Sequence, residues 1–288
     1  MIDEITYSHG KQVNVMGPAG STILAASKLG KKVKLITKVG EDIPIEYVSQ
    51  LNKIGIDLSD MIVKGVNTTR MILDVRGNDR KGHMEHFCEE IKPEDIKELP
   101  NAVMVAPVMG EITWSALQSI KADVMAVDPQ GFVRAQWRAK DDSILLRRWI
   151  DEGILQRYSV FKSTEDELQS FSGYSDTLKA LEKITENGPE VAVATRGEKG
   201  ALLVTKENKR YKVPVSELKV KHDDMGAGDC FSAGFFCEYL DGMDPLWCAS
   251  MGSSLASCIL ETVGPRIDTS LKEIRERAED VFERIEKL

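Results

Sequence analysis

The chain has 288 residues, a formal net charge of −8 and 42% hydrophobic residues. This length is enough to bury a sizeable core, and the acidic balance argues against a nucleic-acid-binding protein, which needs a basic face. We expect neither a membrane span nor a leader peptide, because the apolar runs are short and no charged segment precedes one. Five cysteines without a C-x-x-C pair favour a reducing, cytoplasmic environment over a disulfide-linked scaffold.

Nothing in the composition marks a domain boundary, so we predict a single domain over residues 1–288. Residues 1–15 alternate weakly around Ser8–Lys11, which predicts a hairpin. Residues 68–87 predict a second hairpin, whose many charges favour a small exposed sheet beside the main domain. Between the hairpins we expect a turn at Gly17–Ser21, helices from Thr22 to Leu29 and from Ile43 to Ile54, and a strand from Val33 to Val39.

Strands and helices alternate in the second half of the chain. Short apolar strands separated by amphipathic helices predict a parallel sheet covered by helices on both faces. In such folds ligands bind beyond the carboxyl ends of the strands. The expected strands run from Ala102 to Val108, Asp123 to Val127, Tyr158 to Phe161 and Val191 to Thr195, and the expected helices from Thr113 to Ile120, Ser143 to Asp151, Thr164 to Phe171, Asp176 to Glu186 and Leu271 to Ile285.

The most informative stretch is Met225-Gly226-Ala227-Gly228-Asp229, which leads into a long apolar segment. Three small residues in a row let the backbone approach a ligand and let successive N–H groups point the same way. A helix that begins there adds its unpaired N–H groups and its dipole to an anion site. Asp229 would then lie beside the anion, where it can take a proton from an attacking hydroxyl. The same residues could also form only a capped helix start after a turn.

Two other groups of polar residues leave alternatives open. Asp128 and Gln130 follow a predicted strand, so they either face a ligand at the edge of the sheet or only shape the turn. His83 and His86 lie three residues apart in a predicted strand, which places them on opposite faces. We therefore interpret the two histidines as exposed residues, or as one substrate contact, rather than as a shared metal site.

Four motifs follow one another in a consistent order along the chain. Met16–Ser21 is a glycine-containing segment, Gly40–Asp42 is a short acidic turn, Thr195–Gly200 is a second glycine turn, and Met225–Phe231 holds the small residues before Asp229. In order and spacing these motifs resemble the ribokinase-like (PfkB) family of carbohydrate and nucleoside kinases, over about Ile2 to Arg266. The resemblance implies a ribokinase-like three-layer α/β/α fold, with a mainly parallel central sheet and a small β-sheet lid formed by residues 4–15 and 68–88.

The resemblance also implies a role for each matching residue. Asp229 would be the general base that deprotonates the acceptor hydroxyl, Asp3 would accept hydrogen bonds from substrate hydroxyls, and Glu165 would hold Mg²⁺ through water. The anion hole would be formed by Gly226, Ala227 and Gly228. The nucleotide would be lined by Thr195, Gly197 and Gly200, and the acceptor pocket would be bordered by Gly17, Gly20 and Ser21.

Several positions depart from the family pattern. Ser21 and Lys162 stand where the family commonly has asparagine, and Met225 replaces a usual threonine. The family also begins with an apolar strand well before the aspartate that corresponds to Asp3. We therefore expect either a central sheet that lacks one strand or a further segment upstream of Met1, and we favour the upstream segment.

These observations predict a kinase that uses ATP and Mg²⁺ to phosphorylate a hydroxyl of a small sugar, polyol or cyclitol, and they leave a monovalent cation open. The polar hairpin at 68–88 favours a polyhydroxy acceptor. One alternative is a nucleoside kinase of the same family, and another is a catalytically silent nucleotide-binding regulator, against which the retained Asp229 argues. We expect no nucleic acid and no membrane as a partner, whereas an exposed lid edge predicts a homodimer through the lid.

Overall fold

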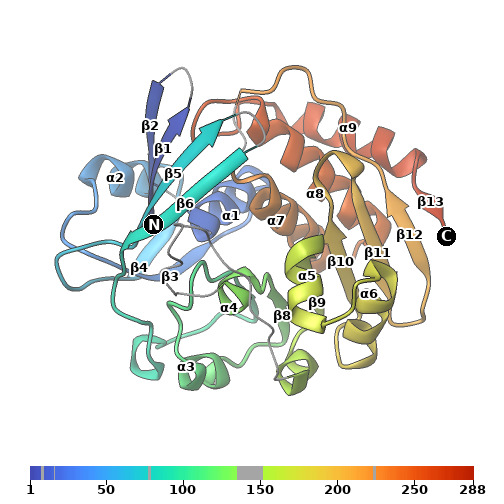
Figure 1. The fold of residues 1–288 in the computed structure, drawn as a ribbon, viewed down its shortest axis with the longest axis horizontal. Coiled ribbons are helices and arrows are strands. Elements are labelled where there is room, and N and C mark those ends of the chain that lie inside the picture. The colour runs from blue at the N-terminus through green and yellow to red at the C-terminus, as the bar shows by residue number, and fades with distance from the viewer. Residues whose placement is uncertain (8–9, 16, 77–78, 135–151, 223–224) are drawn as a thin grey trace.

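The computed structural model describes residues 1–288 except 8–9, 16, 77–78, 135–151 and 223–224 (Figure 1). The described chain forms a seven-stranded sheet, a four-stranded sheet and a two-stranded sheet. Helices cover both faces of the largest sheet, so the three-layer α/β/α arrangement is confirmed (Figure 1). The predicted helix from Ser143 to Asp151 lies outside the described residues.

The central sheet is parallel on one side and antiparallel on the other. Its order is β7-β8-β9-β10-β11-β12-β13, and the pairs from β7 to β10 are parallel, as the alternation of strands and helices predicts. The later pairs are antiparallel: short turns join β10 to β11 and β11 to β12, and β13 pairs with β12 after the C-terminal helices. The strands are β7 (Ala102–Val105), β8 (Val124–Val127), β9 (Val160–Thr164), β10 (Val191–Thr195), β11 (Ala201–Thr205), β12 (Arg210–Val213) and β13 (Glu286–Lys287).

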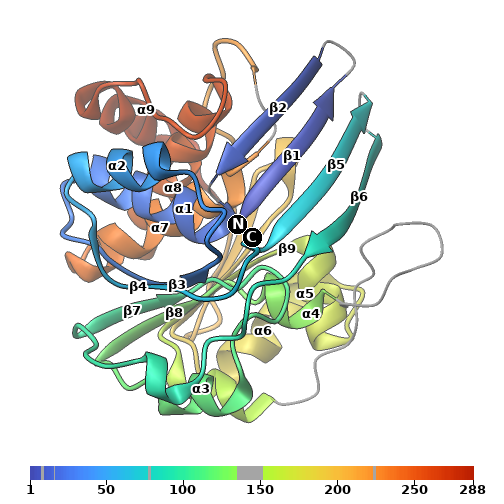
Figure 2. The same cartoon turned by 90° about the vertical axis from the view of Figure 1, so that its left-hand side faces the viewer.

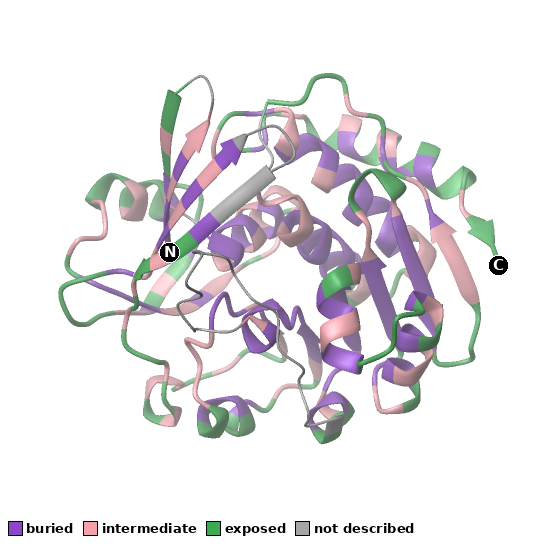
Figure 3. Cartoon of the chain, in the orientation of Figure 1, coloured by how far each residue is buried: buried purple, intermediate pink, exposed green. Residues whose placement is uncertain are grey.

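Each face of the central sheet packs against its own group of helices. Buried residues are concentrated in the strands and in the helices directly behind them (Figure 3). Helix α7 is apolar nearly all round its circumference, because it lies between the sheet and the outer helices. None of the described helices is both long and apolar enough to span a membrane. One face is covered by α3 (Trp114–Ser119), α5 (Glu165–Ser172) and α6 (Thr177–Glu186), and the other by α1 (Gly17–Lys28), α7 (Ala227–Leu240), α8 (Pro245–Leu260) and α9 (Leu271–Glu283).

The first helix differs from the sequence prediction. Gly17–Ser21 was expected to form a turn, whereas α1 already begins at Gly17. Pro18 is compatible with the first turn of a helix, where its missing N–H group costs no hydrogen bond. The small residues of this turn also let α1 approach α7, so the segment has a packing function that local turn statistics do not reveal.

The lid sheet consists of the two predicted hairpins joined side by side. Its order is β2-β1-β5-β6, with β1 antiparallel to β2 and parallel to β5. The four strands project from the body of the molecule (Figure 2). Val13 on the edge strand β2 is 60% exposed, and the homodimer through this edge stays a prediction. The strands are β1 (Ile2–Tyr7), β2 (Gly10–Val15), β5 (Arg70–Arg76) and β6 (Asp79–His86).

A break separates the remaining strands from the central sheet. Strands β3 (Lys34–Val39) and β4 (Asp57–Val63) form their own parallel sheet, connected through α2 (Ile45–Lys53). Figure 2 shows this pair beside β7 and β8, and in the described residues β3 and β7 are both edge strands. A largely apolar cavity of about 370 Å³ lies between them. Among the described residues no strand pairs with both β3 and β7, and the segment expected upstream of Met1 stays a prediction.

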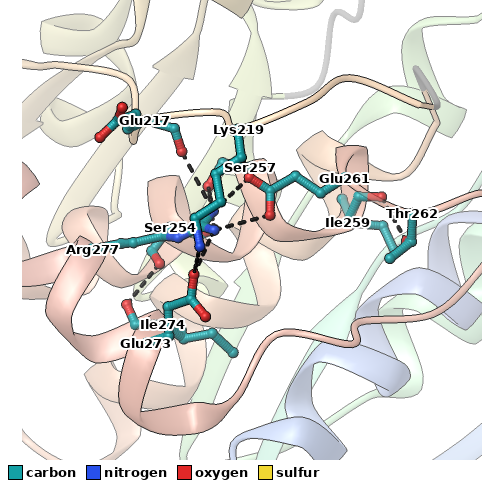
Figure 4. Close-up of polar contacts among 10 residues, drawn as sticks. All are labelled: Glu217, Lys219, Ser254, Ser257, Ile259, Glu261, Thr262, Glu273, Ile274 and Arg277. Atoms are coloured by element: carbon teal, nitrogen blue, oxygen red, sulfur yellow. Dashed lines mark hydrogen bonds and ion pairs between the residues drawn. The ribbon is translucent and has the colours of Figure 1, made fainter.

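A polar cluster on the outer helices fixes the segment that leads into α7 (Figure 4). The guanidinium of Arg277 on α9 donates to both carboxylate oxygens of Glu261, at 2.9 and 3.0 Å, and to Glu273 at 2.8 Å. The backbone N–H of Lys219 donates to the same Glu261 carboxylate at 2.8 Å. Because a bidentate pair between arginine and a carboxylate is directional, it anchors residues 214–222 and the end of α8 to α9.

Candidate active site

A cavity of about 630 Å³ lies between the lid sheet and the carboxyl ends of β8 and β9, where α7 begins. Ligands of doubly wound α/β folds bind at this edge of the sheet, so the position agrees with the fold class. The cavity wall includes residues from β1, β2, β5 and β6 on the lid side. The wall therefore combines two parts of the chain that are far apart in sequence.

Most of the residues singled out in the sequence meet at this cavity. Ser21 of α1 approaches the start of α7 so closely that a Cβ on Gly226 would lie 2.8 Å from its hydroxyl oxygen. The glycine segment at the start of α1 and the small-residue segment before Asp229 are thus in direct contact. The predicted residues that line the cavity are Asp3, Gly17, Ser21, Gly226, Ala227, Gly228 and Asp229.

Other predicted residues lie elsewhere. Gly20 lines a separate cavity of only about 60 Å³. Glu165 accepts a hydrogen bond of 2.6 Å from the hydroxyl of Thr177 and is not part of the wall. Thr195 pairs in register with Thr164, which does line the cavity, so the turn that holds Gly197 and Gly200 lies one strand further along the same sheet edge.

The start of α7 has the geometry of an anion site. Gly226 adopts a left-handed conformation with φ of 80°, and no side chain caps the helix after it. The N–H groups of the first turn are therefore directed at the cavity without a side-chain acceptor. Space for a side chain is tight here, because a Cβ on Gly228 would lie 3.0 Å from the ammonium nitrogen of Lys162. Glycine lets the backbone itself form the wall.

Asp229 is half-buried in the first turn of α7. Loss of hydration and the nearby carboxylate of Asp128 raise the pKa of Asp229 to about 7, although Lys162 and a hydrogen bond from Gln130 act against this rise. The amide Nε2 of Gln130 donates to Oδ1 of Asp229 at 3.2 Å and fixes its orientation. A carboxylate with a pKa near neutrality accepts a proton more readily than an ordinary aspartate.

Asp3 is the second carboxylate of the cavity and is only 3% exposed. Burial raises the pKa of Asp3 to about 6, while the ammonium of Met1, the N–H of Gly17 and the Arg134 guanidinium lower it. Its Oδ1 has no hydrogen-bond partner among the described residues. A buried acceptor without a donor costs free energy of folding, so a ligand hydroxyl that donates to it would recover that cost.

The structure also settles the alternatives for Asp128 and Gln130, because both line the cavity. Gln130 begins the short helix α4 (Gln130–Val133), which directs its amide towards Asp229. Asn14, Arg134 and Glu167 are among the wall residues that sequence reasoning missed. Asn14 could have been found, since the predicted hairpin places it opposite the aspartate of β1.

The part of the lid that β5 contributes to the cavity wall is apolar, which corrects the expectation that the 68–88 hairpin presents a polar surface to the acceptor. Met71, Leu73 and Val75 alternate along β5 and line the cavity. Arg70 points elsewhere and forms ion pairs with Glu4 and with Asp42, the latter at 3.2 Å. Because successive side chains of a strand point to opposite faces, charge counted over the whole hairpin does not describe the face that meets the ligand.

Comparisons with known proteins show the family to which the chain belongs. Residues 4–272 match the pfkB family of carbohydrate kinases. A cytidine kinase from Thermococcus kodakarensis is 26% identical, over 91% of this chain and 94% of that protein. An inositol 3-kinase from Arabidopsis thaliana is 27% identical, over 81% of this chain and 64% of that protein. The structure of a pyrophosphate-dependent kinase in the ribokinase family has the same fold, with a TM-score of 0.81 and 19% identity over 96% of both chains. The chain therefore belongs to the pfkB family of carbohydrate kinases.

Proposed function

We propose that this chain transfers a phosphoryl group from ATP to a hydroxyl of a nucleoside, with Asp229 as the general base. As a member of its family the chain is a phosphotransferase that acts on a hydroxyl group. The observation that carries the finer proposal is the position of Asp229, which follows the anion site and lines the same cavity as the buried carboxylate of Asp3. One carboxylate can therefore orient the acceptor while the other takes its proton.

In the proposed reaction Asp3 accepts a hydrogen bond from one acceptor hydroxyl, which orients the hydroxyl that reacts. Asp229 takes the proton of the attacking hydroxyl as its oxygen bonds to phosphorus, and the bond from phosphorus to the bridging oxygen of the donor breaks. The N–H groups at the start of α7 stabilise the negative charge on the transferred group. The apolar lid face over the cavity excludes water, which would otherwise compete as the acceptor.

The turn after β10 fits a nucleotide at one of its two glycines. No atom lies within 4 Å of the place where a side chain on Gly197 would begin, so its backbone is open to a ligand. A Cβ on Gly200 would lie 2.1 Å from the carbonyl oxygen of Val213, so that glycine is required by packing. We therefore assign the nucleotide contact to Thr195 and Gly197, and we assign Gly200 to the shape of the turn.

The first turn of α5 offers carboxylates for the Mg²⁺ that accompanies ATP. Glu165 is bonded to Thr177, and Glu167 pairs with Arg134 at 3.1 Å, whereas Asp166 is exposed and lines the cavity. Mg²⁺ prefers oxygen ligands and keeps several of its waters, so it needs few protein carboxylates beside the donor phosphates. Asp166 is thus better placed than Glu165 to hold the ion, which neutralises phosphate charge when bound. In the described ranges no three His, Cys, Asp or Glu side chains form a metal cage.

The pKa values of the two cavity carboxylates predict an acidic limit to activity. Burial raises the pKa of Asp229 to about 7 and that of Asp3 to about 6, and both residues act in the deprotonated form. We expect kcat/KM for the acceptor to fall about tenfold per pH unit below about pH 7, more steeply below about pH 6, and to be level above about pH 8. Initial rates measured across this pH range give the pH dependence of kcat/KM. An acidic limb centred near the ordinary aspartate pKa would contradict the assignment of Asp229.

The cavity favours a nucleoside over a sugar or a cyclitol as acceptor. One part of the lid, the β1–β2 hairpin, presents Asp3 and Asn14 opposite each other, and another part, strand β5, presents Met71, Leu73 and Val75. A nucleoside carries hydroxyls at one end and a planar base at the other, which matches this division. The similarity to a cytidine kinase supports the same class, whereas the similarity to an inositol kinase supports the cyclitol alternative.

Release of ADP from ATP, measured across nucleosides, sugars and inositols, tests the acceptor class. We expect kcat/KM for at least one nucleoside to exceed that for every sugar and inositol by roughly tenfold, since burying one large apolar surface contributes about 1.5–3 kcal/mol. Leu73→Asn should remove most of this preference, and Ile72→Asn, on the opposite face of β5, should keep it. A preference for myo-inositol that Leu73→Asn leaves unchanged would favour the cyclitol alternative.

A further inference from the structure

A buried ion pair lies beneath the start of α7, and the reaction proposed above does not use it. The ammonium nitrogen of Lys162, on β9, lies 2.8 Å from Oδ2 of Asp128, and their side chains are 5% and 1% exposed. Both residues line the cavity. A buried pair is a weak source of stability, because the desolvation of two charges offsets most of their attraction. Because the pair lines a ligand cavity, we infer that it contributes to ligand binding rather than to stability.

The ammonium of Lys162 lies directly beside the anion site. A Cβ on Gly228 would be 3.0 Å from this nitrogen, so the lysine ammonium and the first turn of α7 are closely packed. An anion held by the N–H groups of that turn would have a full positive charge as its neighbour. A lysine ammonium is a compact point charge that binds phosphate oxygens without a fixed geometry.

Asp128 is fixed by hydrogen bonds of its own and therefore positions the ammonium of Lys162. Its Oδ2 also accepts from the hydroxyl of Ser232 at 3.3 Å, and its Oδ1 accepts from the N–H of Gln130 at 3.4 Å. The carboxylate is thus anchored from α7 and from α4, and it accepts one of the three N–H groups of the ammonium. Burial acts to lower the pKa of Lys162, but the carboxylates of Asp128, Asp229 and Glu167 raise it, so the ammonium stays charged at neutral pH.

We propose that Lys162, held by Asp128, binds the phosphoryl group that is transferred and adds a fixed positive charge to the backbone anion site. This proposal rests on the kinase reaction proposed above and names a phosphate-binding residue of that site. Preorganised charges in a site of low dielectric stabilise a transition state without reorganisation during the reaction. Lys162 would therefore act on the transferred group, whereas the orientation of the acceptor would not depend on it.

The test uses inorganic phosphate as the probe and the protein without acceptor or nucleotide. The double variant Lys162→Met/Asp128→Asn removes both charges and leaves neither side chain as an unpaired ion. The matched control is Lys38→Met/Asp95→Asn, since Lys38 is 2% exposed at its side chain, pairs with Asp95 at 2.6 Å and lies outside the cavity. Calorimetry gives the phosphate affinity, and the melting temperature shows that each variant is folded. Lys162→Gln, which can still donate to Asp128, is the second variant should the double variant fail to fold.

We expect wild type and control to bind inorganic phosphate equally, and both Lys162 variants to bind it at least about tenfold more weakly. With ATP and the preferred acceptor, kcat of the Lys162 variants should fall by roughly 10²-fold while KM for the acceptor is retained. Equal phosphate affinity in all four proteins, or no phosphate binding by the wild type, would overturn the proposal. Either result leaves the acceptor panel unaffected, because that panel does not depend on phosphate binding.

Discussion

Replacing Asp229 by asparagine is expected to lower kcat by at least about 10²-fold, which corresponds to about 2.7 kcal/mol in the activation free energy. Asparagine keeps the shape of the side chain and can still accept the hydrogen bond that Gln130 donates. It cannot take a proton from the attacking hydroxyl. The loss should therefore appear in kcat for the preferred acceptor, with ATP affinity and melting temperature close to those of the wild type.

The competing interpretation, that Asp229 only begins a helix, has a direct control in the same chain. Asp244 caps α8 and accepts from the N–H of Leu246 at 2.8 Å, and it does not line the cavity. Asparagine caps a helix nearly as well as aspartate, so Asp244→Asn should leave kcat unchanged. If Asp229→Asn behaves like Asp244→Asn, Asp229 is not the base. A wild-type protein that binds ATP and phosphorylates nothing would favour the silent regulator.

Replacing Asp3 by alanine is expected to lower kcat/KM for the acceptor by roughly 10²-fold or more, or about 3 kcal/mol, and to leave ATP affinity nearly unchanged. The buried Oδ1 of Asp3 has no hydrogen-bond partner among the described residues, so we expect a hydroxyl of the acceptor to donate a hydrogen bond to it. Loss of this contact removes binding and alignment together. Initial rates at varied acceptor and at varied ATP separate the two effects.

The control for Asp3 is its neighbour on the opposite face of β1. Glu4 forms an ion pair with Arg70 and does not line the cavity, so Glu4→Gln should leave kcat/KM for the acceptor unchanged. Because burial raises the pKa of Asp3 to about 6, its charged form opposes folding above about pH 6. Asp3→Asn should therefore be at least as stable as wild type at neutral pH. Equal losses for ATP and acceptor, or a fall in melting temperature, would mark Asp3 as structural.

Local patterns predicted the parts of the site that depend on few neighbouring residues. The hairpin of residues 1–15 follows from alternation, and its register brings Asn14 opposite Asp3. The small residues before Asp229 predicted both the start of a helix and the open backbone at Gly226, where φ is 80°. These features could be predicted from the sequence because the conformation of each segment depends mainly on the residues within that segment.

The features that sequence reasoning missed depend on the direction in which side chains point or on contacts between residues far apart in the sequence. Counting charges over residues 68–87 ignored the two faces of β5 and so obscured the apolar row that lines the cavity. The strand that holds Lys162 ends at Thr164, three residues after its predicted end, and α5 begins at Glu165. The phase of that first turn, which the sequence does not specify, decides that Asp166 rather than Glu165 lines the cavity.

In the proposed reaction the lid itself carries the acceptor contact, because Asp3 lies on β1 and β1 pairs with both β2 and β5. Under that proposal, an acceptor bonded to Asp3 would stabilise the lid strands, and part of its binding free energy would hold them over the cavity. ATP bound alone would not make this contact, so no acceptor hydroxyl would hold the lid strands over the phosphates. We therefore expect hydrolysis of ATP by the protein to stay slow until an acceptor binds.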